Sequence, residues 1–297
     1  MTSALVPISP RGAAGVQPRR SGEPGVLAGA HRPPRIRAVC LDIDDTLVDF
    51  TSSARRAVSD LIGRDDMWTR WQLTTDEFVA RVVAGELPYD LMHQARTKAF
   101  FADLGALLDD DLVAVLEERR RLQLNSAWRL FDDALPCLDW LRAAGLRLAA
   151  VTNASGRHQL AKLASLGIAR FFDTVVIAGE LGAAKPEPMI FHAACERLDV
   201  SIDETMHIGD LLEVDAIGAR DAGLHGVWLD RTGRGTSGTC GPTGGLPRLE
   251  TLADLPELLV SEYLTPDACG ESALPEQRGE EPVSASAQAW SNISHRR

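Results

Sequence analysis

Short apolar runs that alternate with helix-like stretches are the feature that most limits the folds open to this chain. The runs contain β-branched residues and occupy residues 36–42, 146–151, 174–177, 205–209 and 226–229. Continuous apolar runs of this length are typical of strands buried on both faces of a parallel sheet. Between the later runs leucines recur at helical spacing, and Gly145 and Gly167 stand where two helices would end. The sequence therefore predicts an α/β fold with a Rossmann-like parallel sheet.

The interval 51–131 contains no strand-like run and interrupts this alternation. Its apolar residues have helical spacing, and one helical face is formed by Leu112, Val115, Leu116 and Leu122. Four aromatic residues are expected in its core: Trp68, Trp71, Phe100 and Phe101. About eighty residues are more than a βα crossover needs. We predict an inserted α-helical cap of roughly four helices, with the α/β core formed by 36–50 and 132–262. The alternative is a separate helical domain packed elsewhere.

Both ends of the chain lack periodicity. Residues 1–35 are rich in Pro, Gly and Arg, and residues 263–297 are rich in Ser, Glu and Pro. We predict a disordered basic leader and a disordered tail. A targeting peptide or a polyanion-binding arm is the alternative for the leader. The Gly- and Thr-rich segment 232–247 is predicted to be a surface loop.

Charge and cysteine content bound the possible partners. The chain has 297 residues and a formal net charge of −11, which argues against a general binder of nucleic acid or of anionic membranes. Its five cysteines form no CxxC pair, and no window is apolar enough for a membrane span. We therefore expect a cytoplasmic protein that has no membrane partner.

The stretch AVCLDIDDTLVDF, residues 38–50, ends a buried strand in three aspartates. Residues two apart in an extended chain point to the same side, so Asp42 and Asp44 share one side and Asp45 lies on the other. Like charges packed together raise the free energy of the folded state unless a cation or a shared proton relieves them. The stretch therefore requires either a cation or a shared proton near Asp42 and Asp44, whereas Asp45 is expected to cap a turn or a helix.

Other polar residues follow the later strands. Thr152 and Asn153 end the second predicted strand, and Asp210 ends the fourth. Lys185 precedes a helix predicted to begin at Pro186. Ligands of open parallel sheets bind beyond the carboxyl ends of the strands, so these side chains are expected to meet at one rim.

This set resembles the haloacid dehalogenase-like hydrolase superfamily, in its phosphatase branch with a helical cap. The resemblance extends over residues 36–259, and its matching pieces are D-x-D-x-T (Asp42, Asp44, Thr46), Thr152 with Asn153, Lys185 in KPEP, and G-D-x-x-x-x-D (Gly209, Asp210, Asp215). It implies a Mg²⁺-dependent phosphatase that hydrolyses a small phosphorylated metabolite through an aspartyl phosphate.

The resemblance also implies a role for each matching residue. Asp42 would be the nucleophile, and it needs no base because an aspartate is ionised at neutral pH. Asp44 would be the general acid, and its backbone carbonyl would bind Mg²⁺ together with Asp42 and Asp210. Thr152, Asn153 and Lys185 would bind the phosphate, and Thr152 and Lys185 are counted with the catalytic residues. Thr46 and Asp215 would support these groups from outside the coordination sphere.

The fourth motif departs from the family pattern, because Leu211 and Val214 stand where many relatives have Ser and Asn. Two alternatives to a hydrolase remain open: a phosphotransferase or mutase that uses the same aspartyl phosphate, and a non-catalytic binding protein of the same fold. Dehalogenation is less favoured, since that branch lacks an acid at the position of Asp44. His207 is expected to pack within a strand.

Overall fold

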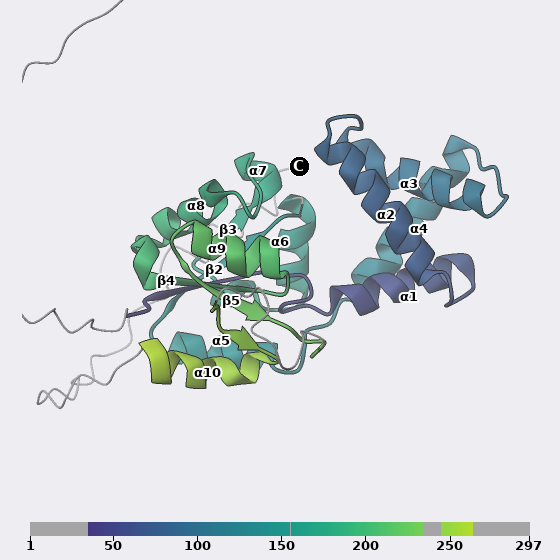
Figure 1. Ribbon diagram of the computed structural model, residues 1–297. Helices are drawn as coiled ribbons and strands as arrows, with labels where there is room; N and C mark the ends of the chain where they lie inside the picture. Colours follow the sequence, from purple (N-terminus) through teal and green to yellow (C-terminus); the bar gives the residue numbers. More distant parts are fainter. Residues whose placement is uncertain (1–34, 155, 234–244, 264–297) are drawn as a thin grey trace, which may run out of the picture. The chain divides into compact units, whose positions relative to one another are not determined.

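The computed structural model describes residues 35–154, 156–233 and 245–263. The predicted leader and tail therefore lie outside the described residues, apart from Arg35 and Tyr263, and so does most of the predicted loop 232–247. One parallel sheet organises the described part (Figure 1). Its strands, in the order β3-β2-β1-β4-β5-β6 across the sheet, are β1 (Ala38–Leu41), β2 (Arg147–Thr152), β3 (Thr174–Ile177), β4 (Thr205–Gly209), β5 (His225–Leu229) and β6 (Arg248–Leu249).

The five predicted strands are confirmed, with ends shifted by at most two residues. Strand β6 was not predicted, because two residues carry no readable alternation. β1 pairs with β2 on one side and with β4 on the other, so that Leu41 aligns with Ala150 and with Ile208. The chain order reverses between β1 and β4, and the residues that follow these strands lie at the switch point where such sheets bind ligands.

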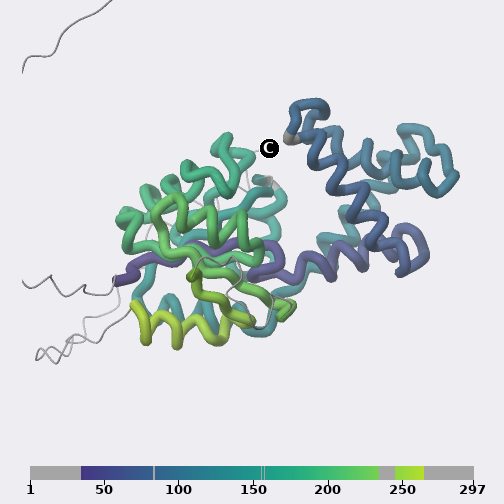
Figure 2. Tube along the Cα trace, viewed as in Figure 1, coloured from purple at the N-terminus to yellow at the C-terminus, as the bar shows by residue number. Residues whose placement is uncertain are grey.

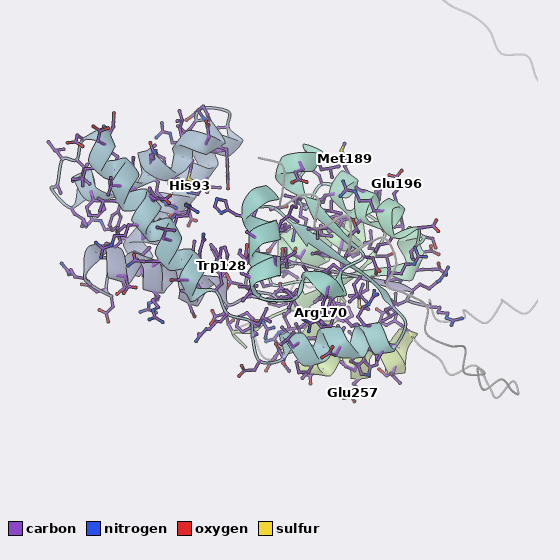
Figure 3. The ribbon with its side chains drawn as sticks, turned by 180° about the vertical axis from the view of Figure 1, so that it is seen from behind. His93, Trp128, Arg170, Met189, Glu196 and Glu257 are labelled. Carbon is purple, nitrogen blue, oxygen red and sulfur yellow. The ribbon has the colours of Figure 1, made fainter. Side chains whose placement is uncertain are left out.

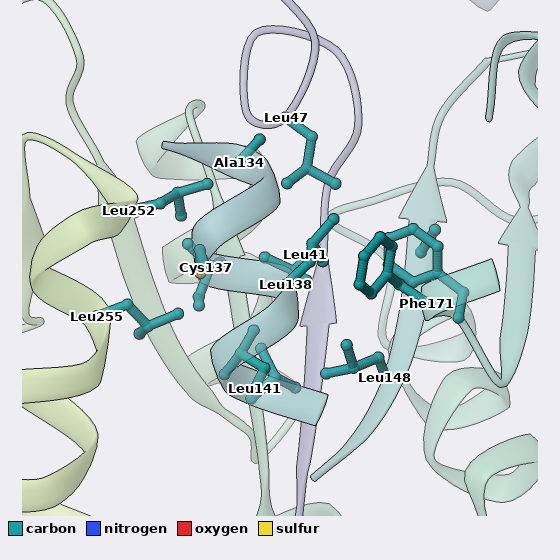
Figure 4. Close-up of a cluster of buried hydrophobic side chains, with 14 of the residues drawn as sticks. Leu41, Leu47, Ala134, Cys137, Leu138, Leu141, Leu148, Phe171, Leu252 and Leu255 are labelled. Atoms are coloured by element: carbon teal, nitrogen blue, oxygen red, sulfur yellow. The ribbon is translucent and has the colours of Figure 1, made fainter. Parts of the chain in front are cut away.

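Helices cover both faces of the sheet, so all four residues of β1 are buried. Val39 and Leu41 of β1 pack into the cluster under α5 (Ala134–Ala143) and α10 (Leu255–Leu258), which Figure 4 shows in close-up. Ala38 and Cys40 pack into the opposite cluster, under α8 (Pro188–Leu198) and α9 (Gly218–Asp221). The strand is thus apolar on both sides, as its sequence requires.

The remaining elements connect the strands or follow the last of them. They are α6 (Gly156–Ser165), α7 (Ala178–Leu181), the 3-10 turns Ala169–Phe171, Ile202–Glu204 and Leu252–Asp254, and the π-helical segments Leu212–Ile217 and Leu259–Tyr263. The helix expected from Pro186 begins at Pro188 instead. Glu187 is extended, because a residue that precedes a proline is kept out of the helical region. Among the described helices, none combines the length and the apolar composition needed to cross a bilayer.

Between β1 and α5 stand four helices. They are α1 (Phe50–Ile62), α2 (Trp68–Val83), α3 (Tyr89–Asp103) and α4 (Asp110–Ala127), and we call them the helical insertion. Figure 2 shows β1 leading through a short loop into the insertion. The outgoing and returning chains pair at an isolated bridge between Val48 and Leu130. The Phe131 N–H also donates to the Leu47 carbonyl at 3.0 Å, so the two connections run side by side.

The prediction that the apolar face of α4 is buried is wrong. Leu112, Val115 and Leu122 are exposed, whereas the buried face carries Val113, Glu117 and Arg120. The aromatic prediction holds, since Trp71 and Phe100 are buried in edge-to-face contact and Trp68 and Phe101 pack against them.

Paired charges explain how α4 buries polar residues. Glu117 forms ion pairs with Arg96 of α3 at 2.8 Å and with Arg120 at 3.0 Å. Both guanidinium groups lie over the Trp71 ring, 4.3 and 5.6 Å from its centroid. Buried charges are tolerated where they are paired and hydrogen-bonded, and this network takes the place of the leucine contacts that periodicity predicts.

Candidate active site

Three carboxylates gather at the switch point of the sheet. Asp42 follows β1, Asp210 follows β4, and Asp215 lies one turn further on in a π-helical segment. One oxygen from each lies within 4.8 Å of the others. Gly209 permits this approach, because a Cβ at that position would overlap the Asp215 side chain.

The Lys185 ammonium is the positive partner of this cluster. Its Nζ lies 2.5 Å from Asp42 Oδ1 and 2.7 Å from Asp215 Oδ1, and its side chain is only 2% exposed. Burial acts to lower the pKa of Lys185, but attraction by Asp42 and Asp215 outweighs it and the pKa is raised. Lys185 is therefore charged, and it contacts the predicted nucleophile directly.

A single ammonium does not neutralise three carboxylates. Burial raises the pKa of Asp42 to about 7 in spite of the nearby Lys185. Burial, with repulsion from Asp42 and Asp215, raises the pKa of Asp210 to about 8. The pKa of Asp215 is instead held well below its usual value, since Lys185 and His207 outweigh the effect of burial. Excess negative charge on hard oxygen donors fits a divalent cation such as Mg²⁺.

Asn153 fixes the position of Lys185 through the backbone. The Lys185 N–H donates to Asn153 Oδ1 at 2.8 Å, and Asn153 Nδ2 donates to the Lys185 carbonyl at 2.9 Å. Both polar side-chain atoms of Asn153 are thus engaged with the Lys185 backbone, and its backbone N–H and the second N–H of Nδ2 remain as donors for a phosphate. Thr152 is buried at the end of β2 and its Oγ1 accepts from Gln159 Nε2 at 3.1 Å, so its own proton is available to a ligand.

Asp44 is held by two residues that sequence reasoning missed. Gln159 Nε2 donates to Asp44 Oδ2 at 2.6 Å, and the Lys162 ammonium forms an ion pair with Asp44 Oδ1. Both come from α6, which follows Thr152 and Asn153. One signal pointed to Lys162, because only three of the chain's 31 basic residues are lysines: Lys98, Lys162 and Lys185.

The supporting residues lie close to the predicted site. Asp215 accepts hydrogen bonds from the Leu211 N–H at 3.0 Å and forms a 3.1 Å contact with His207 Nε2, in addition to its ion pair with Lys185. The side chain of Leu211 is exposed, so its departure from the family pattern leaves this backbone contact intact. Thr46 is buried, and among the described residues its Oγ1 has no hydrogen-bond partner.

His207 and Asp45 lie in the surroundings that the sequence predicts for them. His207 is buried in β4, edge-on to Phe191, and burial lowers its pKa, as expected of a histidine packed in a strand. Asp45 accepts hydrogen bonds from the N–H and Oγ1 of Thr51 at 2.8 and 2.7 Å, so it caps the start of α1.

A cavity of about 280 Å³ adjoins Asp44. Its walls come from α3, α4 and α6 and include Tyr89, His93, Trp128, Gln159 and Lys162; Figure 3 labels His93 and Trp128. Trp128 Nε1, His93 Nδ1 and Gln159 Oε1 are buried without a hydrogen-bond partner among the described residues. These three residues place polar side chains in the wall of the cavity beside Asp44.

An aspartate in contact with a buried lysine lies at the switch point of the sheet, beside two further carboxylates. The comparisons with known proteins identify the class to which a chain with this site belongs. The family model for haloacid dehalogenase-like hydrolases matches residues 36–223. The chain therefore belongs to this family.

Several individual proteins are similar to this chain. The glyceraldehyde 3-phosphate phosphatase of Methanopyrus kandleri is 32% identical over 66% of this chain and 84% of its own length. The N-acylneuraminate-9-phosphatase of Mus musculus is 28% identical over 67% of this chain and 85% of its own length. Among solved structures, the HAD-hydrolase YfnB from Bacillus subtilis bound to magnesium is 25% identical, with a TM-score of 0.64, and the match covers 76% of this chain and 99% of that one.

Proposed function

We propose that this chain is a Mg²⁺-dependent phosphatase that hydrolyses a small phosphomonoester through an aspartyl phosphate on Asp42. The observation that carries the proposal is the placement of Asp42, within 2.5 Å of the Lys185 ammonium and in the carboxylate cluster with Asp210 and Asp215. The similarity to two named phosphatases supports the same reaction class.

The carboxylate cluster supplies the ligands for Mg²⁺. The side chains of Asp42 and Asp210 and the backbone carbonyl of Asp44 would hold the ion, while Asp215 orients Lys185. When bound, Mg²⁺ offsets the repulsion between an anionic nucleophile and an anionic phosphate.

The first chemical step forms a bond between an Asp42 carboxylate oxygen and phosphorus while the ester P–O bond breaks. Asp44 is ionised in the structure, where it pairs with the Lys162 ammonium. In its protonated form it gives its proton to the leaving oxygen, so the product is a neutral alcohol. Lys185 offsets the charge of nucleophile and phosphate, and Thr152 Oγ1 with the Asn153 backbone N–H binds the phosphate oxygens.

The second step returns the protein to its starting state. Asp44, now ionised, accepts a proton from a water molecule that attacks phosphorus. The bond between phosphorus and Asp42 breaks, inorganic phosphate leaves, and Asp44 is again protonated. Both steps use the same two carboxylates and need no other reactant.

The adjoining cavity favours a small substrate. A volume of about 280 Å³ holds the alcohol part of a metabolite but not a folded phosphoprotein. The alcohol would lie against Trp128, His93 and Gln159, whose buried polar atoms are unpartnered among the described residues.

A panel of phosphorylated metabolites assayed with Mg²⁺ tests the proposal. We expect wild type to release inorganic phosphate without an added acceptor, and Asp42→Asn to abolish turnover while retaining the fold by circular dichroism. Comparable turnover in Asp42→Asn would remove Asp42 as nucleophile. Phosphate release that needs an acceptor alcohol would identify a phosphotransferase, and the absence of Mg²⁺ binding would favour a non-catalytic binding protein.

A further inference from the structure

We propose that Lys162 is a positioning residue that couples the Asp44 carboxylate to both ends of the helical insertion. The proposal rests on the proposed function, in which Asp44 is the acid. Lys162 belongs to α6, and its side chain is only 4% exposed. Its ammonium forms an ion pair with Asp44 Oδ1.

The same ammonium contacts the two residues at which the insertion begins and ends. Phe50 is the first residue of α1 and Trp128 directly follows α4. Lys162 Nζ lies 4.8 Å from the centroid of the Phe50 ring and 5.4 Å from that of Trp128. A cation at this distance from an aromatic face is attracted by the electrons of the ring. Lys162 therefore joins both ends of the insertion to one carboxylate.

Gln159 completes the fixation of Asp44. Its Nε2 donates to Asp44 Oδ2, the oxygen that Lys162 does not contact. Gln159 and Lys162 are three residues apart on α6 and thus lie on the same face of the helix. With one donor on each oxygen, the carboxylate group cannot turn freely. This ionised form is the one that accepts a proton from water in the second step, and the orientation of the carboxylate toward that water controls the rate.

The position of the insertion thereby acts on Asp44. A movement of either end of the insertion carries the Phe50 or Trp128 ring with it, and the ring carries the ammonium. The compact ammonium of lysine suits this place between two rings and a carboxylate better than a planar guanidinium. In a chain with only three lysines, two lie against Asp42 and Asp44.

The first test compares kcat and KM for Lys162→Met, Lys162→Arg and the control Lys98→Met. Lys98 carries the same group but forms an exposed pair with Asp110 in the insertion. We expect Lys162→Met to lower kcat at least about tenfold with KM changed less than about threefold, Lys162→Arg to recover part of the loss, and Lys98→Met to match wild type. A raised KM with unchanged kcat would instead make Lys162 a substrate contact and overturn the proposal.

Double variants test whether Lys162 acts through Asp44. In the Asp44→Asn background, Lys162→Met is expected to cost less than about twofold in kcat, because the group that it positions is already absent. In the Lys162→Met background, Phe50→Leu is likewise expected to have little effect on kcat, although it lowers kcat in wild type. The proposal would be overturned if the loss of kcat in each double variant equalled the product of the losses in its two single variants.

A final measurement needs no turnover and separates this inference from the proposed function. Phe50→Leu is introduced into wild type and into Lys162→Met, and the urea unfolding equilibrium of all four proteins is measured. The effect of Phe50→Leu on the unfolding equilibrium constant should be at least about threefold smaller without Lys162. Equal effects would overturn the contact even if phosphatase activity is found. If the effect of Phe50→Leu on unfolding depends on Lys162 but the wild-type protein releases no phosphate, only the proposed function is refuted.

Discussion

The Asp44 side chain combines partial exposure with strong fixation. It is 26% exposed, while both its oxygens are engaged by residues of α6. It is therefore open to the cavity on one side and held from the other. This arrangement suits a group that must exchange a proton with a bound molecule without changing its position.

Asp44→Asn should slow hydrolysis by about 10²–10⁴-fold, because an amide cannot supply the proton that the leaving oxygen needs. The loss should be largest for alkyl phosphates and smallest for p-nitrophenyl phosphate, whose leaving group needs no acid. The control is Asp45→Asn, which removes the same charge from the neighbouring residue but keeps an oxygen able to cap α1. A loss that is uniform across leaving groups would argue against an acid role for Asp44.

Asp42 and Asp210 predict how the stability of the metal-free protein depends on pH. Their pKa values are raised to about 7 and about 8 in the folded protein, whereas an unfolded aspartate titrates near 4. Between these values the folded state binds more protons than the unfolded state, so these groups make the free energy of unfolding fall as pH rises from about 4 to about 8.

Urea unfolding in the presence of a chelator, between pH 5 and pH 8, measures this effect. The decline with rising pH should be smaller in Asp210→Asn, which keeps the size of the side chain but cannot ionise. An identical pH profile in wild type and variant would show that Asp210 titrates normally. Excess Mg²⁺ should also flatten the wild-type profile, because the ion binds the ionised carboxylates.

At the scale of single elements, α4 is stabilised by charges as well as by apolar contacts. Glu117 forms ion pairs with both Arg96 and Arg120, and all three side chains are buried. Burial and repulsion from Arg120 lower the pKa of Arg96 to about 10, which expresses the cost of bringing two cations together. The carboxylate offsets that cost.

Glu117→Gln should lower the free energy of unfolding by about 3 kcal/mol, because it leaves two buried cations without a counter-charge. Glu118→Gln is the matched control on the next residue, where the ion pair with Arg121 is exposed and contributes little to stability. Chemical denaturation of the two variants measures the difference. Equal losses of unfolding free energy in the two variants would mean that the buried Glu117 network stabilises the fold no more than an exposed ion pair does.

Whether a strand, a helix face or a site residue could be predicted depended on the local sequence pattern of its element. The strands were predictable because residues buried on both faces leave continuous apolar runs, and Asp42 and Asp210 were predictable because they follow such runs. The buried face of α4 was not, since periodicity counts leucines and cannot see that Glu117 has two partners. Lys162 and Gln159 were missed because their contact with Asp44 depends on how α6 packs beside β1, which no local pattern records.

At the scale of the whole molecule, the carboxylate cluster unites segments that are far apart in sequence. Asp42 and Asp210 are joined only through the pairing of β1 with β4. Any ligand that binds both therefore binds the folded chain and not the unfolded one, and must stabilise the fold.

Addition of Mg²⁺ should raise the free energy of unfolding, by about 2.7 kcal/mol at a concentration one hundred times the Kd. Removal by a chelator should reverse the gain, and both Asp42→Asn and Asp210→Asn should abolish it. Thermal unfolding with and without Mg²⁺ measures the change. A gain of equal size in Asp210→Asn would place the ion elsewhere.

The bridge between Val48 and Leu130 has a consequence for how such a molecule can diversify. Because the outgoing and returning chains meet side by side, the pairing of the strands does not depend on the length or the sequence of the segment inserted between Val48 and Leu130. Another set of helices, or a different kind of module, could be grafted at these two positions without disturbing the strands that carry the carboxylates. Substrate selection and chemistry can thus diverge separately within one polypeptide, provided that the replacement keeps aromatic contacts to Lys162 like those of Phe50 and Trp128.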